Sequence, residues 1–164
     1  MRALRRGAPA EPPAPSELRP KAVLLASEDR PISTAAIDQA ARLAEPARAP
    51  VYVFAIARVH GTSFGFPNPG LLPTKAEWEA QRASVQKAVK ALRKRGLRSE
   101  GRVVGTRAAG KRIVREAERL GCEAIVMGAD APRSAWVADF IWSQEPQRVR
   151  RRARMPVYLV TTSG

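Results

Sequence analysis

The segments AIVMGADAPRS (residues 124–134) and MPVYLV (residues 155–160) decide the fold of this chain. The apolar run at residues 124–127 contains β-branched side chains, which predicts a strand of a parallel sheet that is buried on both faces. Gly128 follows this run, and we expect it to let the backbone turn sharply. The second segment has the same apolar character, so it predicts another strand of the same sheet.

A helix is expected between these two strands. Ser143 supplies an N-cap hydroxyl, and an acid and a proline fall in the first turn, so the helix should run to about Ala153. Pro156 ends it, and residues 157–160 form the next strand. A strand, a loop, a helix and a strand in this order make a right-handed crossover between parallel strands.

The earlier part of the chain repeats this alternation. Thr74 and Glu77 form a capping box at the start of a long helix, and Gly96 follows its end. The expected strands are residues 21–26, 51–57 and 101–105, the last polar enough for a sheet edge, and the expected helices are residues 32–44, 74–95 and 109–120. The pattern predicts an α/β fold: a single doubly wound, Rossmann-like domain with a five-stranded parallel sheet flanked by helices. Such sheets bind ligands where the strand order reverses.

Length and composition indicate one domain with an extension. The chain has 164 residues and a single cysteine, Cys122, which we interpret as a packed residue in a reducing compartment. Residues 1–19 combine basic residues and prolines, so we expect a flexible N-terminal arm in front of a domain at residues 20–164. The lack of a signal-like segment and of a run of ~18 apolar residues favours a cytoplasmic protein without a membrane span.

The chain is strongly basic. A net charge of +14 and an isoelectric point near 11.4 favour anionic partners. Residues 148–154 contain an arginine cluster, which we interpret as the solvated end of a helix, where the helix dipole favours cations. Nucleic acid is a less favoured partner, because no aromatic residues for base stacking lie between these arginines and no zinc, RRM or KH motif is present.

Two features have some likeness to enzyme sites. Residues 105–112 (GTRAAGKR) nearly match a phosphate-binding P-loop, but Arg112 stands where a hydroxyl must hold Mg²⁺. His60, the only histidine, follows an expected strand, but no nucleophile or carboxylate partner can be assigned to it. We therefore expect no catalytic residues, no metal site and no enzymatic activity.

Four segments match one known family in order along the chain. KAVLLASEDRPISTAAIDQAARLA (residues 21–44) is similar to that family's first strand and helix, and PVYVFAIAR (residues 50–58) to its second strand. GRVVGTRAAGKRIVREAERLGCEAIVMGAD (residues 101–130) is similar to its third strand, third helix and fourth strand, and RRRARMPVYLV (residues 150–160) to its last helix and strand. Residues 20–162 thus resemble the universal stress protein family. The resemblance implies the strand order 3-2-1-4-5, with a site between strands one and four.

The resemblance also implies a nucleotide pocket. Members of the family that bind ATP carry G-x-x-G-(x)9-G-[ST] after strand four. Here Gly128 fills the first position, Ala131 stands at the second glycine and Trp142 and Ser143 at the final pair, with one extra residue between. A β-carbon at Ala131 and an indole at Trp142 reduce the space for phosphates, so the pocket is expected to be reduced or altered. The nucleotide-binding residues that the resemblance implies are Ala26, Ser27, Glu28, Ile56, Met127, Gly128 and Ser143.

The family commonly forms homodimers through its last strand, which is a sheet edge. The implied interface residues are Val157, Tyr158 and Leu159. The expected function is a non-enzymatic stress-response regulatory or binding module. Two alternatives stay open: a nucleotide-dependent switch or slow ATPase that binds ATP and Mg²⁺, with Gly128, Arg133 and Ser143 holding the phosphates, and a basic binder of nucleic acid or another anionic partner.

Overall fold

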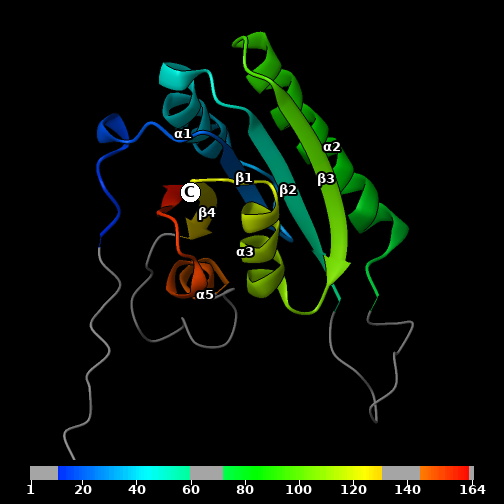
Figure 1. The fold of residues 1–164 in the computed structure, drawn as a ribbon. Coiled ribbons are helices and arrows are strands. Elements are labelled where there is room, and N and C mark those ends of the chain that lie inside the picture. The colour runs from blue at the N-terminus through cyan, green and yellow to red at the C-terminus, as the bar shows by residue number, and fades with distance from the viewer. Residues whose placement is uncertain (1–10, 60–71, 131–144, 163–164) are drawn as a thin grey trace, which may run out of the picture.

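The computed structural model describes residues 11–59, 72–130 and 145–162. It confirms the predicted α/β fold, with five parallel strands in the order β3-β2-β1-β4-β5 (Figure 1). The strands are β1 (Val23–Glu28), β2 (Val51–Arg58), β3 (Ser99–Thr106), β4 (Ala124–Asp130) and β5 (Val157–Thr162). The helices are α1 (Thr34–Ala44), α2 (Lys75–Lys94), α3 (Ala109–Arg119) and α5 (Glu145–Arg152), with short 3-10 turns η1 (Pro15–Glu17) and η2 (Glu45–Ala47).

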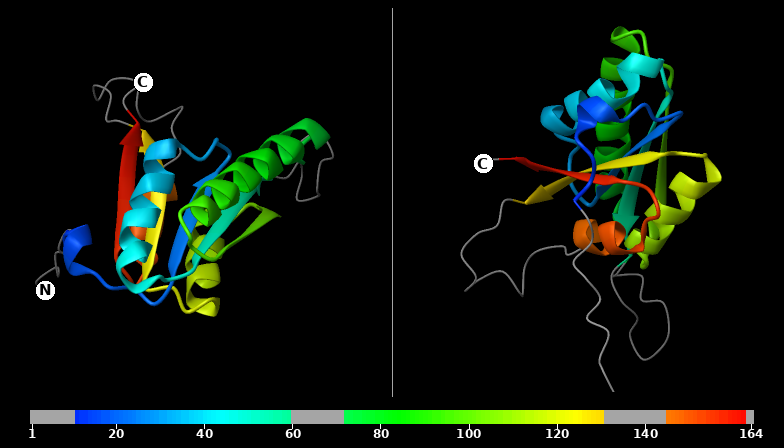
Figure 2. Two further views of the ribbon diagram at one scale, coloured as in Figure 1. Left: turned by 90° about the horizontal axis from the view of Figure 1, so that it is seen from above. Right: turned by 60° about the vertical axis from the view of Figure 1, so that its left-hand side comes forward.

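Helices cover both faces of the sheet, as Figure 1 and Figure 2 show. α1 and α2 pack on one face, where Leu43 and Leu92 are fully buried, and α3 and α5 pack on the other, where Ile113 and Val149 are fully buried. β1 is buried along its whole length, because each face of the strand lies under a helix layer. Its unbroken apolar run is the sequence pattern that this environment requires.

α2 packs unusually close to the edge strand β3. The predicted capping box starts this helix: the Thr74 N–H donates to Glu77 Oε2 at 2.6 Å, and the Glu77 N–H donates to Thr74 Oγ1 at 3.2 Å. A Cβ atom at Gly101 of β3 would stand 2.2 Å from Val85 Cγ1, and one at Gly105 would stand 3.2 Å from Trp78 Cζ2. The two glycines therefore allow the close approach, and Trp78 packs between helix and sheet.

Two expectations for strand ends were wrong. Gly128 does not turn the chain, because it lies inside β4 and pairs with Val160 of β5. β1 does not end at Ala26 but continues to Glu28, which pairs with Ile56 of β2. In both places the neighbouring strand continues and extends the ladder past the end of the apolar run.

Residues 11–19, which the sequence analysis placed in the N-terminal arm, contact the domain. Leu18 packs against the core cluster under α1. The Tyr158 hydroxyl of β5 donates a hydrogen bond of 2.8 Å to the Pro13 carbonyl. This part of the arm therefore lies beside the β5 edge of the sheet, as Figure 2 shows for η1.

Several sequence expectations fall outside the described residues. These are the ones at His60, Ala131, Arg133, Trp142 and Ser143. None of the helices in the described part of the chain has the length and apolar character of a membrane-spanning segment.

Candidate functional site

The candidate site lies at the carboxyl ends of β1 and β4. These central strands pair as far as Ala26 and Met127. Beyond this point β1 continues along β2 to the Glu28–Ile56 pair, and β4 continues along β5. The two strands thus part at the topological switch point, where doubly wound sheets bind their ligands.

A buried ion pair occupies the β1 side of the switch point. The Glu28 side chain is only 4% exposed, and its Oε1 lies 3.2 Å from Nη1 of Arg58, the last residue of β2. An ionised carboxylate is kept this deep only when a partner compensates for its lost hydration, and Arg58 provides that compensation. The Arg58 side chain is about one-third exposed, so it connects the buried carboxylate to the surface.

The turn after β1 is held by the end of β2. Asp29 has a positive φ of 47°, a conformation that aspartate tolerates better than most residues. Its N–H donates to the Ile56 carbonyl at 3.0 Å, and its Oδ1 accepts the Arg58 N–H at 2.8 Å. These two hydrogen bonds compensate for the unfavourable backbone conformation and place Arg30 at the switch point.

Arg30 spans the gap from β1 to β4. The Ser27 hydroxyl donates to the Arg30 carbonyl at 2.6 Å, and the Arg30 side chain reaches over Gly128, where a Cβ atom would lie 3.9 Å from Arg30 Cδ. No other heavy atom among the described residues comes within 4 Å of that position, apart from the chain neighbours of Gly128. Among the described residues, only the cationic Arg30 side chain therefore approaches Gly128 at the switch point.

The predicted site residues divide between the core and the switch point. Ala26, Ile56 and Met127 are at most 1% exposed and belong to the core cluster on the α3 and α5 face. Their side chains are covered by protein in this structure. Ser27 and Glu28 are also buried, but both are bonded to residues at the carboxyl ends of the strands.

Sequence reasoning missed Arg30 and Arg58. Arg58 is the charged residue that ends the apolar run of β2, and Arg30 follows the acidic pair at the end of β1. A charge directly after a buried parallel strand is the signal that would have identified both.

The described residues fit the polar part of a nucleotide better than they fit a metal ion. Arg30 and Arg58 are cations that suit phosphate oxygens. The Glu28 carboxylate is engaged by Arg58. No group of three His, Cys, Asp or Glu side chains within the described ranges is arranged to hold a metal ion.

The P-loop-like segment has a different structure from a phosphate loop. Gly105 lies inside β3, and only Arg107 and Ala108 connect β3 to α3. The Ala108 N–H donates to Thr106 Oγ1 at 3.1 Å, so the connection is a tight turn. A two-residue turn is too short to wrap around a phosphate, and it lies at the β3 edge of the sheet, away from the switch point.

Cys122 belongs to the core cluster on the α3 and α5 face, with 4% of its surface exposed. Burial, together with the negative charge of Glu116, raises the pKa of the Cys122 thiol to about 12. Because the thiolate is the nucleophilic form, this cysteine is chemically inert at neutral pH. The structure agrees with the interpretation of Cys122 as a packed residue.

The sheet order and the switch point define a doubly wound α/β domain of the class that binds ligands between strands one and four. The family model of the universal stress protein family matches residues 20–161. This match spans most of the chain, so the chain belongs to the universal stress protein family, and the predicted resemblance is confirmed.

Solved structures of the family have the same fold. A universal stress protein from Burkholderia pseudomallei is 23% identical, covers 85% of this chain and 95% of its own, and has a TM-score of 0.60. The universal stress protein of Archaeoglobus fulgidus in complex with dAMP is 20% identical, with coverages of 84% and 96% and a TM-score of 0.59. A universal stress protein in complex with cAMP is 21% identical, with coverages of 87% and 98% and a TM-score of 0.60. No protein among the curated sequences matches this chain.

Proposed function

We propose that this chain is a cytoplasmic, non-enzymatic stress-response binding module, whose ligand is an adenine nucleotide held at the switch point in a reduced or altered pocket. The observation that carries the proposal is the parting of β1 and β4 after Ala26 and Met127, with Glu28, Arg30 and Arg58 gathered around it. Among the described residues, the arrangement combines a glycine that only Arg30 approaches with that cation and the Glu28–Arg58 ion pair, and a cation beside a glycine suits a phosphate-bearing ligand.

The comparisons support the ligand class. Two of the solved structures with this fold are complexes with dAMP and cAMP, both adenine nucleotides with a single phosphate. A small phosphate group suits a site whose motif departs from the ATP-binding pattern at Ala131 and Trp142. We therefore expect monophosphates to bind at least as tightly as ATP.

The absence of turnover is supported by the described side chains. Cys122 is the only cysteine among the described residues, and the pKa of its thiol is raised to about 12. The segment that most resembles a phosphate loop contains only a two-residue turn between β3 and α3. Neither feature supplies a nucleophile or a phosphate cradle.

The direct test is to denature freshly purified protein and analyse the released small molecules for adenine nucleotides. Isothermal titration calorimetry with AMP, cAMP and ATP, each with and without Mg²⁺, then measures the affinities. Binding of a monophosphate without a requirement for Mg²⁺ supports the proposal. If neither experiment detects an adenine nucleotide, the ligand class is wrong.

Two variants of one residue locate the site. Gly128→Leu places a bulky side chain at the switch point, whereas Gly128→Ala adds only a methyl group in ordinary contact with Arg30. We expect the leucine variant to lose binding and the alanine variant to keep most of it, with melting temperatures close to that of the wild type. Equal affinities for the leucine variant and the wild type would place the nucleotide elsewhere.

A nucleotide-dependent switch or slow ATPase is the second candidate, favoured by the two arginines at the switch point. Arg30 could neutralise one phosphate group, and the partly exposed Arg58 could contact a second one while it stays paired with Glu28. In this case ATP with Mg²⁺ binds much more tightly than AMP, and ADP accumulates slowly in a purified sample. The Gly128→Leu variant is the control. If it produces no ADP from ATP under the same conditions, the activity belongs to this site.

We also propose that the protein forms a homodimer through β5. The support is that β5 pairs only with β4 among the described strands, so no strand occupies its other edge, beside which the arm around Pro13 lies. Val157 and Tyr158 are buried inside the subunit, at 3% and 7% exposure, whereas Leu159 is partly exposed. The contact would therefore use the β5 backbone and Leu159 more than the other two side chains.

A further inference from the structure

The opposite edge of the sheet, formed by β3, offers a second and independent binding surface. β3 is eight residues long and pairs only with β2 among the described strands. The Val51 N–H donates to the Arg98 carbonyl and the Val59 N–H to the Thr106 carbonyl, so the even-numbered residues turn their backbone groups toward β2. Because these groups alternate along a parallel ladder, those of Gly101, Val103 and Gly105 face the open edge.

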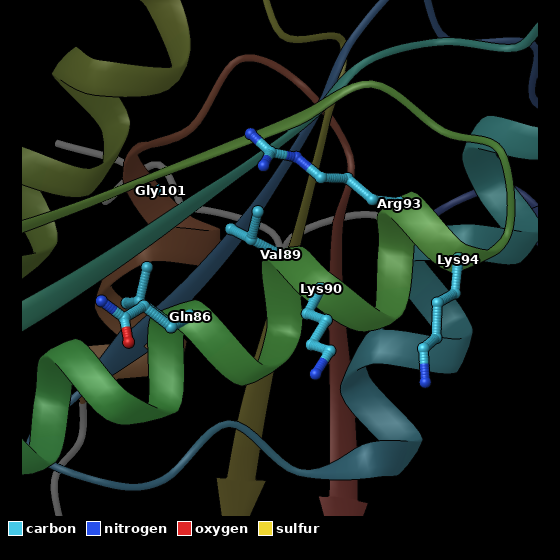
Figure 3. Close-up of a pocket in the computed structure, with 7 residues that line it drawn as sticks. Gln86, Val89, Lys90, Arg93, Lys94 and Gly101 are labelled. Carbon is cyan, nitrogen blue, oxygen red and sulfur yellow. The ribbon is translucent and has the colours of Figure 1, made fainter.

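On the α2 face this edge borders a groove of about 530 Å³. Its floor is apolar, with Val85, Val89 and Gly101, and its other lining residues are Gln86, Lys90, Arg93 and Lys94. Figure 3 shows Arg93 reaching from α2 toward β3, while Lys90 and Lys94 extend from the outer side of the helix. Three cations and no acid line the groove, and the Nε–H of one of them, Arg93, donates to the Ser99 carbonyl at 3.0 Å. The groove therefore suits carboxylate side chains with long aliphatic stems, with Lys90 and Lys94 as their main partners.

On the α3 face the same edge borders a smaller pocket of about 200 Å³. Its apolar lining includes Tyr52, Phe54 and Leu120. Its central charge is already balanced, because the buried Glu116 carboxylate contacts Arg119 at 2.6 Å and Arg102 at 3.6 Å. This pocket therefore suits small apolar side chains and gives no advantage to an added charge.

We propose that the β3 edge is the docking site for an extended segment of a partner protein in which acidic residues alternate with apolar ones. Side chains of an added strand point alternately to the two faces of the sheet. The acidic residues would lie over the cationic groove beside α2, and the apolar residues would enter the pocket beside α3. The backbone groups of Gly101, Val103 and Gly105 would pair with the segment, as in other cases of strand addition.

The glycines of β3 make this edge accessible. Gly101 and Gly105 have no side chains that would cover the backbone, and α2 lies close against them. Sheet edges of this length attract further strands unless charges or prolines protect them. In β3 the charged residues Glu100 and Arg102 lie on the α3 face of the strand, and on the α2 face Arg93 caps only the start of the edge, where its Nε–H donates to the Ser99 carbonyl at 3.0 Å.

The probe for this site is a fluorescein-labelled peptide of eight residues in which Glu and Val alternate. Fluorescence anisotropy with the full-length protein should show saturable binding, and hydrogen exchange should slow at the amides of Gly101, Val103 and Gly105. The control peptide has proline at two of the valine positions and cannot pair as a strand. Equal binding of both peptides would overturn the proposal.

Two pairs of variants separate the backbone and charge contributions. Val103→Pro removes the outward N–H of the edge, and Val103→Ala removes the same side-chain packing but keeps the N–H. Lys90→Glu with Lys94→Glu reverses two groove charges, and Lys87→Glu with Lys111→Glu makes the same change in net charge outside the groove.

We expect the Val103→Pro and the Lys90/Lys94 variants to weaken binding by about tenfold or more, and both controls to bind like the wild type. If Val103→Pro prevents folding, the Lys90/Lys94 pair and its control still decide the question. The proposal is overturned if the Lys87/Lys111 control weakens peptide binding as much as the Lys90/Lys94 variant does. It is also overturned if a single-stranded oligonucleotide displaces the peptide from every variant. Either result identifies a general surface for polyanions. The proposed nucleotide site lies between β1 and β4, away from the β3 edge, and these measurements do not involve it. Their outcome is therefore independent of the proposed function.

Discussion

The close packing of α2 on β3 predicts a strong steric effect of adding one methyl group at Gly101. The new Cβ would stand 2.2 Å from Val85 Cγ1 and 3.0 Å from Val89 Cγ2, whereas carbon atoms in contact are normally about 3.5–4.0 Å apart. Val85 is 5% exposed, and its β-branched side chain has few alternative rotamers. The helix must therefore shift or the valine must adopt an unfavourable conformation.

The expected cost of Gly101→Ala follows from two opposing terms. Overpacking a site of this kind costs about 1–3 kcal/mol. Replacing glycine by alanine in a strand returns about 0.5–1 kcal/mol, because the unfolded chain loses freedom. The net loss of unfolding free energy is about 1–2 kcal/mol, which lowers the melting temperature by roughly 2–8 °C for a domain of this size. Urea denaturation followed by circular dichroism measures the free energy directly.

A double-mutant cycle tests the cause. Val85→Ala removes Cγ1 and on its own should cost about 1.5 kcal/mol through lost burial. In the Val85→Ala background the Gly101→Ala methyl fills the vacated space, so its effect should become neutral or stabilising, with a coupling of about 1–2 kcal/mol. Gly105→Ala is the matched control, because its Cβ would stand 3.2 Å from the edge of the Trp78 indole, which can move, and its cost should stay within about 0.5 kcal/mol.

Additive effects of the two substitutions, or equal costs at Gly101 and Gly105, would refute the steric argument. A stable Gly101→Ala variant with unchanged circular dichroism would show that α2 is free to move away from β3. In that case the groove beside α2 would not have the defined floor that the docking proposal requires.

Three further outcomes follow from the structure. Cys122, whose pKa is raised to about 12, should not react with Ellman's reagent at pH 8 in the folded protein and should react fully in urea; fast reaction without denaturant would contradict its burial. The hydrogen bond from Arg119 lowers the pKa of Glu116 below 4.5, so Glu116→Gln should lower the free energy of unfolding at pH 7 by about 1 kcal/mol. The difference in unfolding free energy between the variant and the wild type should shrink as the pH falls below 4.5. A difference that stays constant with pH would exclude this linkage. Deleting residues 1–17 removes the Pro13 carbonyl that Tyr158 contacts and clears the arm from the β5 edge. Sedimentation analysis should then show a dimer dissociation constant that is lower by about fivefold. A higher dissociation constant would mean that the arm supports the interface.

The sign of the Glu116 effect follows from the direction of its pKa. The folded carboxyl group loses its proton more readily than the unfolded one, because Arg119, Arg102 and Arg112 favour the charged form. The resulting stabilisation is complete above the unfolded pKa and is lost as the pH falls through the folded pKa. Arg119 is more than half exposed, so solvent screening keeps the effect small.

The sequence alone determined the sheet, its helices and the family. The uniformly apolar runs at residues 23–26, 51–57 and 124–127 are typical of parallel strands covered on both faces, and the capping box at Thr74 is a local signal. The family resemblance supplied the strand order, which no local pattern contains, because the order depends on which strands meet after the chain crosses over.

Only the tertiary structure decided the strand ends and the site. Gly128 has the residue type of a turn but lies inside β4, because β5 continues the ladder beside it. Glu28 is buried because Arg58, thirty positions further along the chain, ends the neighbouring strand two residues beyond Ile56, the register partner of Glu28, and reaches the carboxylate with its side chain. The cationic groove beside α2 likewise depends on the distance between Gly101 and Val85, which the pairing of β3 with β2 sets. Sequence patterns show the environment of a residue along its own helix or strand. The contacts described here form between different strands and helices. They depend on how the sheet packs, so only the fold reveals them.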